Sequence, residues 1–186
     1  VRQDIPIAIA SLGPTSVETT AEIADAWLPA FYTAEAASSV WGDALANGAS
    51  KRNPKLAPLE IFAGGSVAIG DGLEAFRDLS RPSAALYIGG MGARSKNFYN
   101  DIFSKSGYSK ESKIIQDLYL SGKKKAAEEA IPDEYLANSS LIGPESFVKE
   151  RIQALKDSGV TSLNINLMGQ NTADRIVQMD LSLIHI

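Results

Sequence analysis

The chain has 186 residues, of which 45% are hydrophobic and 22% are charged, a composition typical of a soluble globular domain large enough to bury a core. Its 18 basic and 22 acidic residues give a net charge of −4 without a basic cluster, which argues against nucleic acid or an anionic membrane surface as a partner. The absence of cysteine excludes disulfides, a thiol nucleophile and a cysteine-ligated zinc, and no apolar run is long enough to span a membrane, so we expect a cytoplasmic protein.

The chain begins with a pattern that predicts a strand, a loop and a helix. Residues 5–10 form a continuous apolar run, which is typical of a buried parallel strand. The helix expected over residues 15–25 carries one stripe of residues at helical spacing, formed by Val17, Thr20, Ala21 and Ala24. Thr15 and Glu18 fit a capping box, which predicts where this helix begins.

Two more strands and one helix are expected next. Residues 27–28 form a short strand candidate, and Thr33 is expected to cap a helix that ends at Gly48. Residues 59–68 form the third strand candidate, which the glycine pair 64–65 interrupts. The order of these elements predicts β-α-β units.

A long helical region is expected after the third strand. Pro82 suits the first turn of a helix that is apolar nearly all round and is therefore expected to be buried. Residues 95–130 predict three further helices separated by Gly107 and Gly122, and Pro132 opens another short one.

The last third of the chain returns to the strand and helix pattern. Residues 144–158 predict a helix with Gly159 just after its end, and the alternation over 160–167 predicts a fourth strand before a helix that starts at residue 172. Four strands joined by helices predict an α/β fold: the C-terminal half of a TIM-type (β/α)8 barrel with a helical insertion, truncated at both ends. The alternative is a complete small α/β sandwich, which would not need so long a helical insert.

Residues 1–180 are expected to form the partial barrel domain, and residues 181–186 a tail of different origin. The tail sequence, Leu-Ser-Leu-Ile-His-Ile, resembles the in-frame translation of a sequencing adapter, the alternative being a genuine hydrophobic terminus. On the adapter interpretation His185, the only histidine, is not native, and no candidate remains for a catalytic or metal-binding histidine.

The loop after the first strand is the main candidate site. A strand that ends in a tight loop and leads directly into a helix points several backbone N–H groups at one place, which is the geometry of a phosphate site. The candidate contacts are Ala10, Ser11, Leu12 and Gly13, with Ser11 offering a hydroxyl. The alternative, that Gly13 and Pro14 merely turn the chain, is equally compatible with the spacing.

A second glycine-rich stretch, residues 89–94, could bring Arg94, Lys96 and Asn97 to an anionic ligand. The interpretation favoured by physical chemistry is that these glycines end a buried helix and turn the chain. The candidate carboxylates lie in separate segments: Asp43, Asp71, Asp101 and Glu145. No metal-ligand cluster and no paired carboxylates are predicted, and no catalytic residue can be assigned.

Three sequence segments carry the resemblance of this chain to a known family. They are the sequence 7–14 with 24–29, the sequence 85–92 with 96–101, and the sequence 141–145 before the last long helix. Together they resemble the luciferase-like flavin and deazaflavin oxidoreductases, especially members that use coenzyme F420. The likeness extends to about Asp180.

The resemblance implies a β/α barrel about twice as long as this chain, in which the loop equivalent to residues 10–13 binds the phosphate-bearing tail of the cofactor. The ring site is implied to lie in an N-terminal half, so the chain alone is expected to be inactive, and its unpaired sheet edges predict a homodimer or aggregate. The implied function is hydride transfer between F420 and a small organic substrate. The alternatives are an FMN-dependent monooxygenase and a non-catalytic barrel protein that has lost its cofactor.

Overall fold

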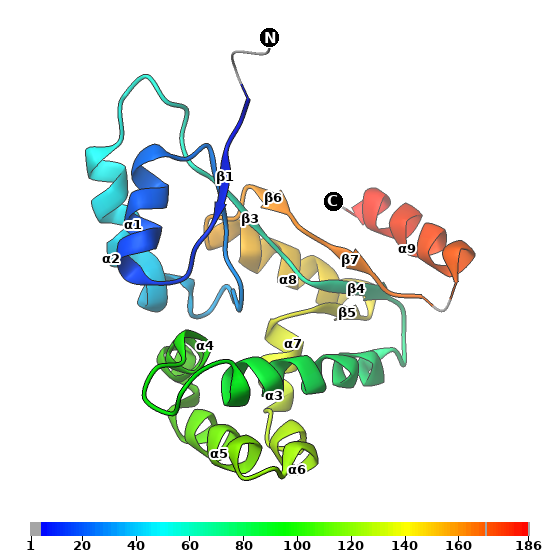
Figure 1. Ribbon diagram of the computed structural model, residues 1–186. Coiled ribbons are helices and arrows are strands. Elements are labelled where there is room, and N and C mark those ends of the chain that lie inside the picture. Colours follow the sequence, from blue (N-terminus) through cyan, green and yellow to red (C-terminus); the bar gives the residue numbers. More distant parts are fainter. Residues whose placement is uncertain (1–4, 170, 186) are drawn as a thin grey trace.

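Short parallel strands and two groups of helices make up the computed structural model, which describes residues 5–169 and 171–185 (Figure 1). One parallel sheet has the strand order β1-β2-β3-β6, formed by β1 (Ala8–Ala10), β2 (Ala26–Leu28), β3 (Glu60–Ala63) and β6 (Ser162–Leu163). The other has the order β5-β4-β7, formed by β5 (Leu141–Gly143), β4 (Ser66–Ile69) and β7 (Asn166–Leu167).

The two sheets are joined because β3 continues into β4 and β6 continues into β7. Phe62 pairs with Ser162 and Ser66 pairs with Asn166, so the register between the two broken strands is the same on both sides of the break. On its other side the first segment pairs with β2 and the second with β5. The predicted strands 59–68 and 160–167 are therefore confirmed, each as two segments.

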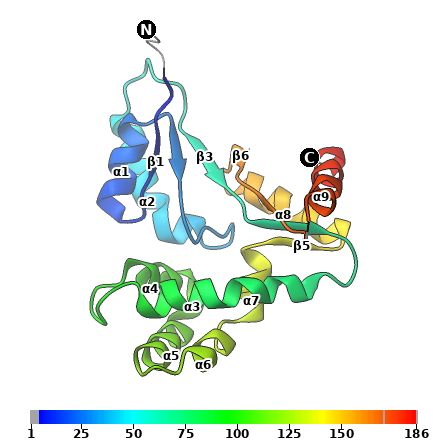
Figure 2. The same ribbon diagram turned by 45° about the vertical axis from the view of Figure 1, so that its right-hand side comes forward.

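Helices α1 (Pro14–Ile23) and α2 (Ala37–Lys51) pack against each other beside β1 and β2, and α8 (Glu145–Asp157) packs against β5. A separate helical layer lies between β4 and β5 in the sequence. It contains the 3-10 helix η1 (Glu74–Ser80), α3 (Arg81–Gly90), α4 (Phe98–Phe103), the π-helical turn η2 (Ser104–Tyr108), α5 (Ser109–Leu120), α6 (Lys124–Glu129) and α7 (Asp133–Asn138). Figures 1 and 2 show this layer facing the ends of β1 and β2 at which the strands lead into their loops.

The two groups of elements have separate hydrophobic cores. The core around the sheet is centred on Trp27 and Trp41, whose rings lie edge to face at 5.4 Å. The core of the helical layer is centred on the buried side chains of Ile88 and Ile115. Phe31 is partly buried and packs against both cores, so the loop after β2 joins the two layers.

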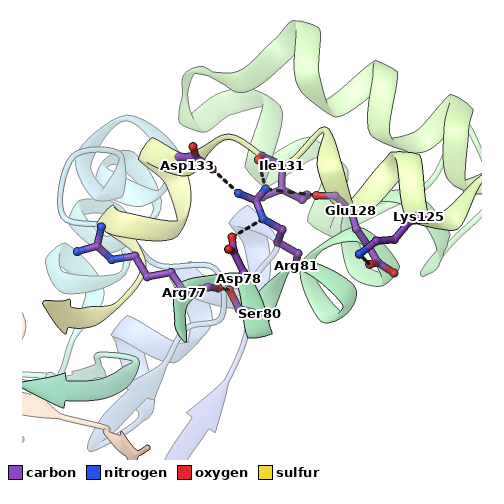
Figure 3. Close-up of polar contacts among 8 residues, drawn as sticks. All are labelled: Arg77, Asp78, Ser80, Arg81, Lys125, Glu128, Ile131 and Asp133. Atoms are coloured by element: carbon purple, nitrogen blue, oxygen red, sulfur yellow. Dashed lines mark hydrogen bonds and ion pairs between the residues drawn. The ribbon is translucent and has the colours of Figure 1, made fainter. Parts of the chain in front are cut away.

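Arg81, in the first turn of α3, holds the helical layer together from within (Figure 3). Its Nε donates to Asp78 at 2.6 Å, and its two terminal nitrogens donate to the backbone oxygen of Ile131 and to the carboxylate of Asp133. The planar guanidinium can reach these acceptors at once because its N–H groups form a rigid fork. The start of α3 is thereby tied to the segment between α6 and α7.

The prediction of a buried first strand is wrong in its burial, although the strand exists and pairs in parallel with β2. Ile5 and Ile7, which precede β1, are 64% and 60% exposed. The apolar run alone could not show that β1 lies at the edge of its sheet.

The predicted capping box is also wrong. Gly13 is the N-cap of α1 and Pro14 occupies the first turn, so Thr15 already lies inside the helix, while Glu18 forms an ion pair with Lys51 of α2. Proline is preorganised for the first helical position, which moves the start of the helix forward. The predicted apolar stripe is confirmed, because Val17, Thr20, Ala21 and Ala24 are all buried.

Thr33 and Gly48 do not delimit the second helix as predicted. Ala36 is the N-cap of α2, and the helix passes through Gly48 to Lys51. The missing side chain of Gly48 has a packing role instead, because a Cβ there would lie 2.2 Å from the backbone oxygen of Glu18 on α1. A glycine that ends a helix and a glycine that lets two helices approach closely are indistinguishable by position alone.

The predicted helix boundaries in the helical layer are largely confirmed. Gly107 and Gly122 have φ values of 101° and 83°, a backbone region that glycine enters at little cost, and both interrupt the helices there. Pro82 lies in the first turn of α3, and Pro132 is the N-cap of α7. The strand β5 was not predicted, because three residues between two helices carry no alternation.

The last described element is α9 (Thr172–His185), which packs beside β4 and β7. The expected helix start at residue 172 is confirmed, and the helix continues past residue 179. Ile186 lies outside the described residues, and the origin of residues 181–186 stays a prediction. Within the described ranges no helix is long and apolar enough to cross a membrane.

Candidate functional site

The carboxyl ends of β2, β3 and β6 face the helical layer across a cavity of about 420 Å³. Loops at this end of parallel strands are where α/β proteins place their ligands. The cavity is lined by Pro29, Ala30, Phe31, Tyr32, Phe62, Ala63, Gly64, Gly65, Ser66, Ser80, Ser83, Ala84, Tyr87, Tyr135, Ser139, Asn164, Ile165 and Asn166. We take this cavity as the candidate site, because it is where the two layers meet.

Aromatic rings form the wall of the cavity between the two layers. The centroid of the Phe31 ring lies 5.8 Å from that of Tyr87, 6.3 Å from that of Tyr135 and 5.3 Å from that of Tyr99. Burial raises the pKa of the Tyr135 hydroxyl far above its ordinary value, so this group stays protonated and neutral. The wall is therefore flat, largely apolar and uncharged.

Phe31 is held in a strained backbone conformation, with φ at 60°. A side chain in this left-handed region costs about 1–3 kcal/mol and persists only where its surroundings fix it. Here the surroundings are the rings of Tyr87, Tyr99 and Tyr135. The strain lies at the cavity wall, where a ligand would be positioned.

The glycine pair between β3 and β4 lets the backbone of neighbouring segments approach. A Cβ on Gly64 would lie 2.4 Å from the backbone oxygen of Asn164, and one on Gly65 would lie 2.5 Å from the backbone oxygen of Ser139. Only glycine fits at two such contacts. The pair thus lets the backbones of Asn164 and Ser139, which both line the cavity, pack closely against the junction of β3 and β4.

Arg151 of α8 fixes the loop after β2. Its guanidinium is buried and binds Glu35 with two nitrogens, one of which also donates to the Asn138 backbone oxygen at 3.0 Å. Partial burial of Glu35 acts to raise the pKa of its carboxyl, but the hydrogen bonds from Arg151, a backbone hydrogen bond and the charge of Arg151 together outweigh it and hold the pKa below its ordinary value. Arg151 thereby ties together α8, the end of α7 and the loop that carries Phe31.

We expect this ion pair to contribute stability that is lost on acidification. Because the folded-state pKa of Glu35 is lower than the ordinary value of 4.5, the contribution is complete above pH 4.5 and disappears as the pH falls through the lowered value. Glu35→Gln should cost less than about 1 kcal/mol at pH 7, since the carboxylate is half exposed. Urea unfolding at pH 7 and pH 3.5 checks this, and an equal cost at both pH values would contradict it.

The predicted contacts Ala10, Ser11, Leu12 and Gly13 do lie together, from the last residue of β1 to the N-cap of α1. They do not line the 420 Å³ cavity. Two of their carbonyls accept indole N–H groups, Ser11 from Trp27 at 2.9 Å and Leu12 from Trp41 at 3.0 Å. The loop is thus held against the sheet core by its backbone.

The Ser11 hydroxyl faces into the protein rather than toward a ligand. It lies 2.8 Å from the Thr20 hydroxyl, which itself donates to the Ser16 carbonyl, so the Ser11 hydroxyl is the donor in the buried pair. The groups left for an anion are therefore backbone N–H groups in the first turn of α1. Val17 N–H bonds to the Gly13 oxygen, and the N–H groups of Thr15 and Ser16 precede the first intrahelical bond.

The second glycine-rich stretch has the structural role that physical chemistry favoured. Gly89 and Gly90 end α3 against Tyr119, where a Cβ would come within 2.5 Å of that side chain. Arg94 is paired with Asp117, and Asn97 is buried under α3. Among the described residues no group of acidic or histidine side chains could hold a metal ion.

Sequence reasoning missed the cavity itself. Phe31, Tyr87, Asn164 and Asn166 come from three distant segments and share no motif. The available signals were the glycine pair 64–65 and the polar residues that interrupt the last strand pattern, and neither indicated which segments would face one another.

Comparison with known proteins gives matches over most of the chain. The luciferase-like monooxygenase family matches residues 1–162. The chain is 35% identical over 166 residues to a protein of Mycobacterium tuberculosis (strain ATCC 25618 / H37Rv) whose name describes it as a coenzyme F420-dependent oxidoreductase. That alignment covers 88% of this chain and 47% of the relative, so the chain spans about half the length of the curated relative that it matches.

Two solved structures share the fold. The coenzyme F420-dependent tetrahydromethanopterin reductase from Methanopyrus kandleri matches 98% of this chain and 51% of its own, with a TM-score of 0.70 and 17% identity. An F420-dependent secondary alcohol dehydrogenase, solved in complex with an F420–acetone adduct, matches 99% of this chain and 48% of its own, with a TM-score of 0.63 and 11% identity. At these identities the likeness confirms the predicted α/β fold class.

Proposed function

Because the chain belongs to the luciferase-like monooxygenase family, we propose that it is part of an oxidoreductase that uses coenzyme F420 and acts on a small organic substrate. The observation that carries the choice of F420 is the 35% identity to a relative named for that cofactor. The two structural neighbours named for F420 support it at the level of the fold. Bound F420 would supply the hydride chemistry, and the protein would supply binding and orientation.

The first turn of α1 fits the phosphate of such a cofactor. The N–H groups of Thr15 and Ser16 point out of the helix end, where the helix dipole favours an anion. A side chain at Gly13 would fit without a clash, since the nearest heavy atom to an added Cβ is the Ser16 hydroxyl oxygen at 3.6 Å, an ordinary contact. Gly13, with the backbone of Thr15 and Ser16, is therefore the proposed grip on the phosphate, and Ala10, Ser11 and Leu12 shape the loop.

The substrate would occupy the 420 Å³ cavity between the layers. Phe31 and Tyr87 offer flat surfaces to its apolar part, and the polar side chains opposite them offer hydrogen bonds. Such a pocket positions a substrate, which is the share of catalysis that a cofactor enzyme takes from its protein.

Titration with F420 and with FMN tests the choice of cofactor. We expect the phosphorus NMR signal of F420 to respond to the chain at lower protein concentration than the signal of FMN. A preference for FMN would favour an FMN-dependent monooxygenase of the same family. Binding of neither cofactor would favour a non-catalytic protein.

Gly13→Asp tests the location of the phosphate. The introduced carboxylate would cap α1 and repel the phosphate by its negative charge, so the affinity for F420 should fall at least about tenfold while the helix is stabilised. Gly13→Ser is the matched control, because it caps the helix without a charge and should retain most of the affinity. Unchanged F420 affinity in Gly13→Asp would place the phosphate elsewhere.

A further inference from the structure

Among the residues that the structure describes, those lining the candidate cavity include no ionisable side chain other than tyrosine. Its lining consists of apolar, aromatic, serine, asparagine and glycine residues, without an aspartate, glutamate, lysine, arginine or histidine. An ion that enters this cavity gives up part of its hydration and meets no counter-charge among the lining side chains, which makes its binding costly. The lining is therefore suited to an uncharged ligand.

The polar groups in this lining are not all used by the protein. The side-chain amides of Asn164 and Asn166 and the hydroxyl of Ser66 form no hydrogen bond within the described part of the chain. Asn166 is in register with Ser66 on the neighbouring strand, so these two side chains come from paired positions. Asn164 lies next to Gly64, whose missing side chain allows its close approach.

Other polar groups around the cavity are already committed. Ser80 donates to the Arg77 oxygen at 2.7 Å, and Ser83 donates to the Ser80 oxygen at 2.9 Å. An adjoining cavity of about 270 Å³ includes Arg77, but this guanidinium is directed at the Ile142 oxygen and stacks over Phe147 at 4.6 Å. This guanidinium is thus occupied in fixing β5 to η1.

We propose that Asn164, Asn166 and Ser66 select an uncharged substrate that carries a carbonyl or hydroxyl group on an apolar body. A carboxamide both donates and accepts, so the pair can bind an alcohol or a ketone without a change of protonation state. The apolar body of the substrate packs on Phe31 and Tyr87. This inference rests on the proposed function only in calling the ligand a substrate.

A matched set of ligands tests the selectivity directly. We would measure binding of cyclohexanone, cyclohexanol, cyclohexanecarboxylate and cyclohexylammonium to the chain by ligand-observed NMR, since these share one apolar ring and differ in the polar group. We expect each neutral ligand to bind at least about tenfold more tightly than either ion. Equal or tighter binding of an ion would overturn the proposal.

Asn164→Asp changes the charge of the cavity with almost no change of shape. It should raise the affinity for cyclohexylammonium about tenfold and weaken binding of cyclohexanone, because the introduced carboxylate supplies a counter-charge and removes a donor. Asn47→Asp, on the exposed face of α2, makes the same change of composition and charge away from the cavity. If both variants shift selectivity equally, the effect is long-range and the proposal fails.

The same samples separate this inference from the proposed function. The F420 titration reports on the first turn of α1, which Asn164→Asp does not touch. Neutral-ligand selectivity without F420 binding would support the cavity assignment and overturn the cofactor. F420 binding without that selectivity would support the cofactor and overturn the cavity assignment.

Discussion

Gly48→Ala is expected to destabilise the chain by about 3 kcal/mol, because the added methyl group meets backbone rather than a movable side chain. A Cβ at this position would lie 2.2 Å from the Glu18 oxygen and 2.6 Å from the Ala21 Cβ. Both belong to α1, so α1 and α2 would have to move apart. Thermal unfolding should show a fall in Tm of about 6–12 °C for a chain of this length.

Gly42→Ala is the matched control for this prediction, since it makes the same change in the same helix. The nearest atom to a Cβ at Gly42 is the Ser38 oxygen at 3.4 Å, an ordinary contact. Alanine is favoured over glycine inside a helix by about 1 kcal/mol, so Gly42→Ala should stabilise the chain. Two variants with the same sign and size would show that helix propensity, rather than the contact between α1 and α2, governs Gly48.

Asn97→Asp should cost about 3 kcal/mol or more, although the two side chains have nearly the same shape. The Asn97 oxygen accepts the N–H groups of Tyr99 and Asn100 at the start of α4, and its NH₂ group donates to the carbonyl oxygens of Tyr87 and Ile88 at 3.0 Å. Asn97 is 3% exposed. The substitution keeps the N-cap of α4, but it places a buried carboxylate oxygen against the carbonyl oxygens of Tyr87 and Ile88.

The pH dependence gives this prediction a second readout. Burial and the facing carbonyls should raise the folded-state pKa of the introduced carboxyl above its unfolded value. The destabilisation should therefore be largest at pH 7 and shrink as the pH falls toward 5, where the carboxyl takes up a proton in the folded state. A cost that is the same at both pH values would show that lost packing, rather than the buried charge, is responsible.

Asn171→Asp provides the matched control. Asn171 accepts the Asp174 N–H at 3.0 Å and is exposed, so the substitution keeps the hydrogen bond without burying a charge. Its effect on the free energy of unfolding should lie within about 0.5 kcal/mol. Urea unfolding of both variants at pH 7 provides the comparison.

Gly48 and Asn97 show that one residue type in the sequence is compatible with two different structural roles. Gly48 was expected to end a helix, yet it lies inside α2 where α1 crosses it. Asn97 was a candidate for binding an anion, yet its side chain joins α3 to α4. The sequence shows which groups a glycine or an asparagine has, but it does not show their contact partners, because these belong to other elements that packing brings together.

One part of the candidate site could be predicted from the sequence and the other part could not. The loop from Ala10 to Gly13 could be predicted because its geometry is local: a strand, a tight turn and a helix within a few residues. Its role in holding the cofactor stays a prediction. The cavity could not be predicted, because Phe31, Tyr87 and Asn164 meet only after β2, α3 and the last broken strand are in place.

The sequence by itself determined the family, the α/β class and most of the helix boundaries, since these depend on local patterns and on short contiguous motifs. Pro82, Gly107, Gly122 and Pro132 act through their own backbone preferences, so their effects could be read without a structure. Only the tertiary structure decided the close approach of α1 and α2 at Gly48, the strand β5 and the uncharged cavity between the layers. Each of these depends on which distant segments lie side by side, and long-range pairing is fixed by the packing of the whole chain.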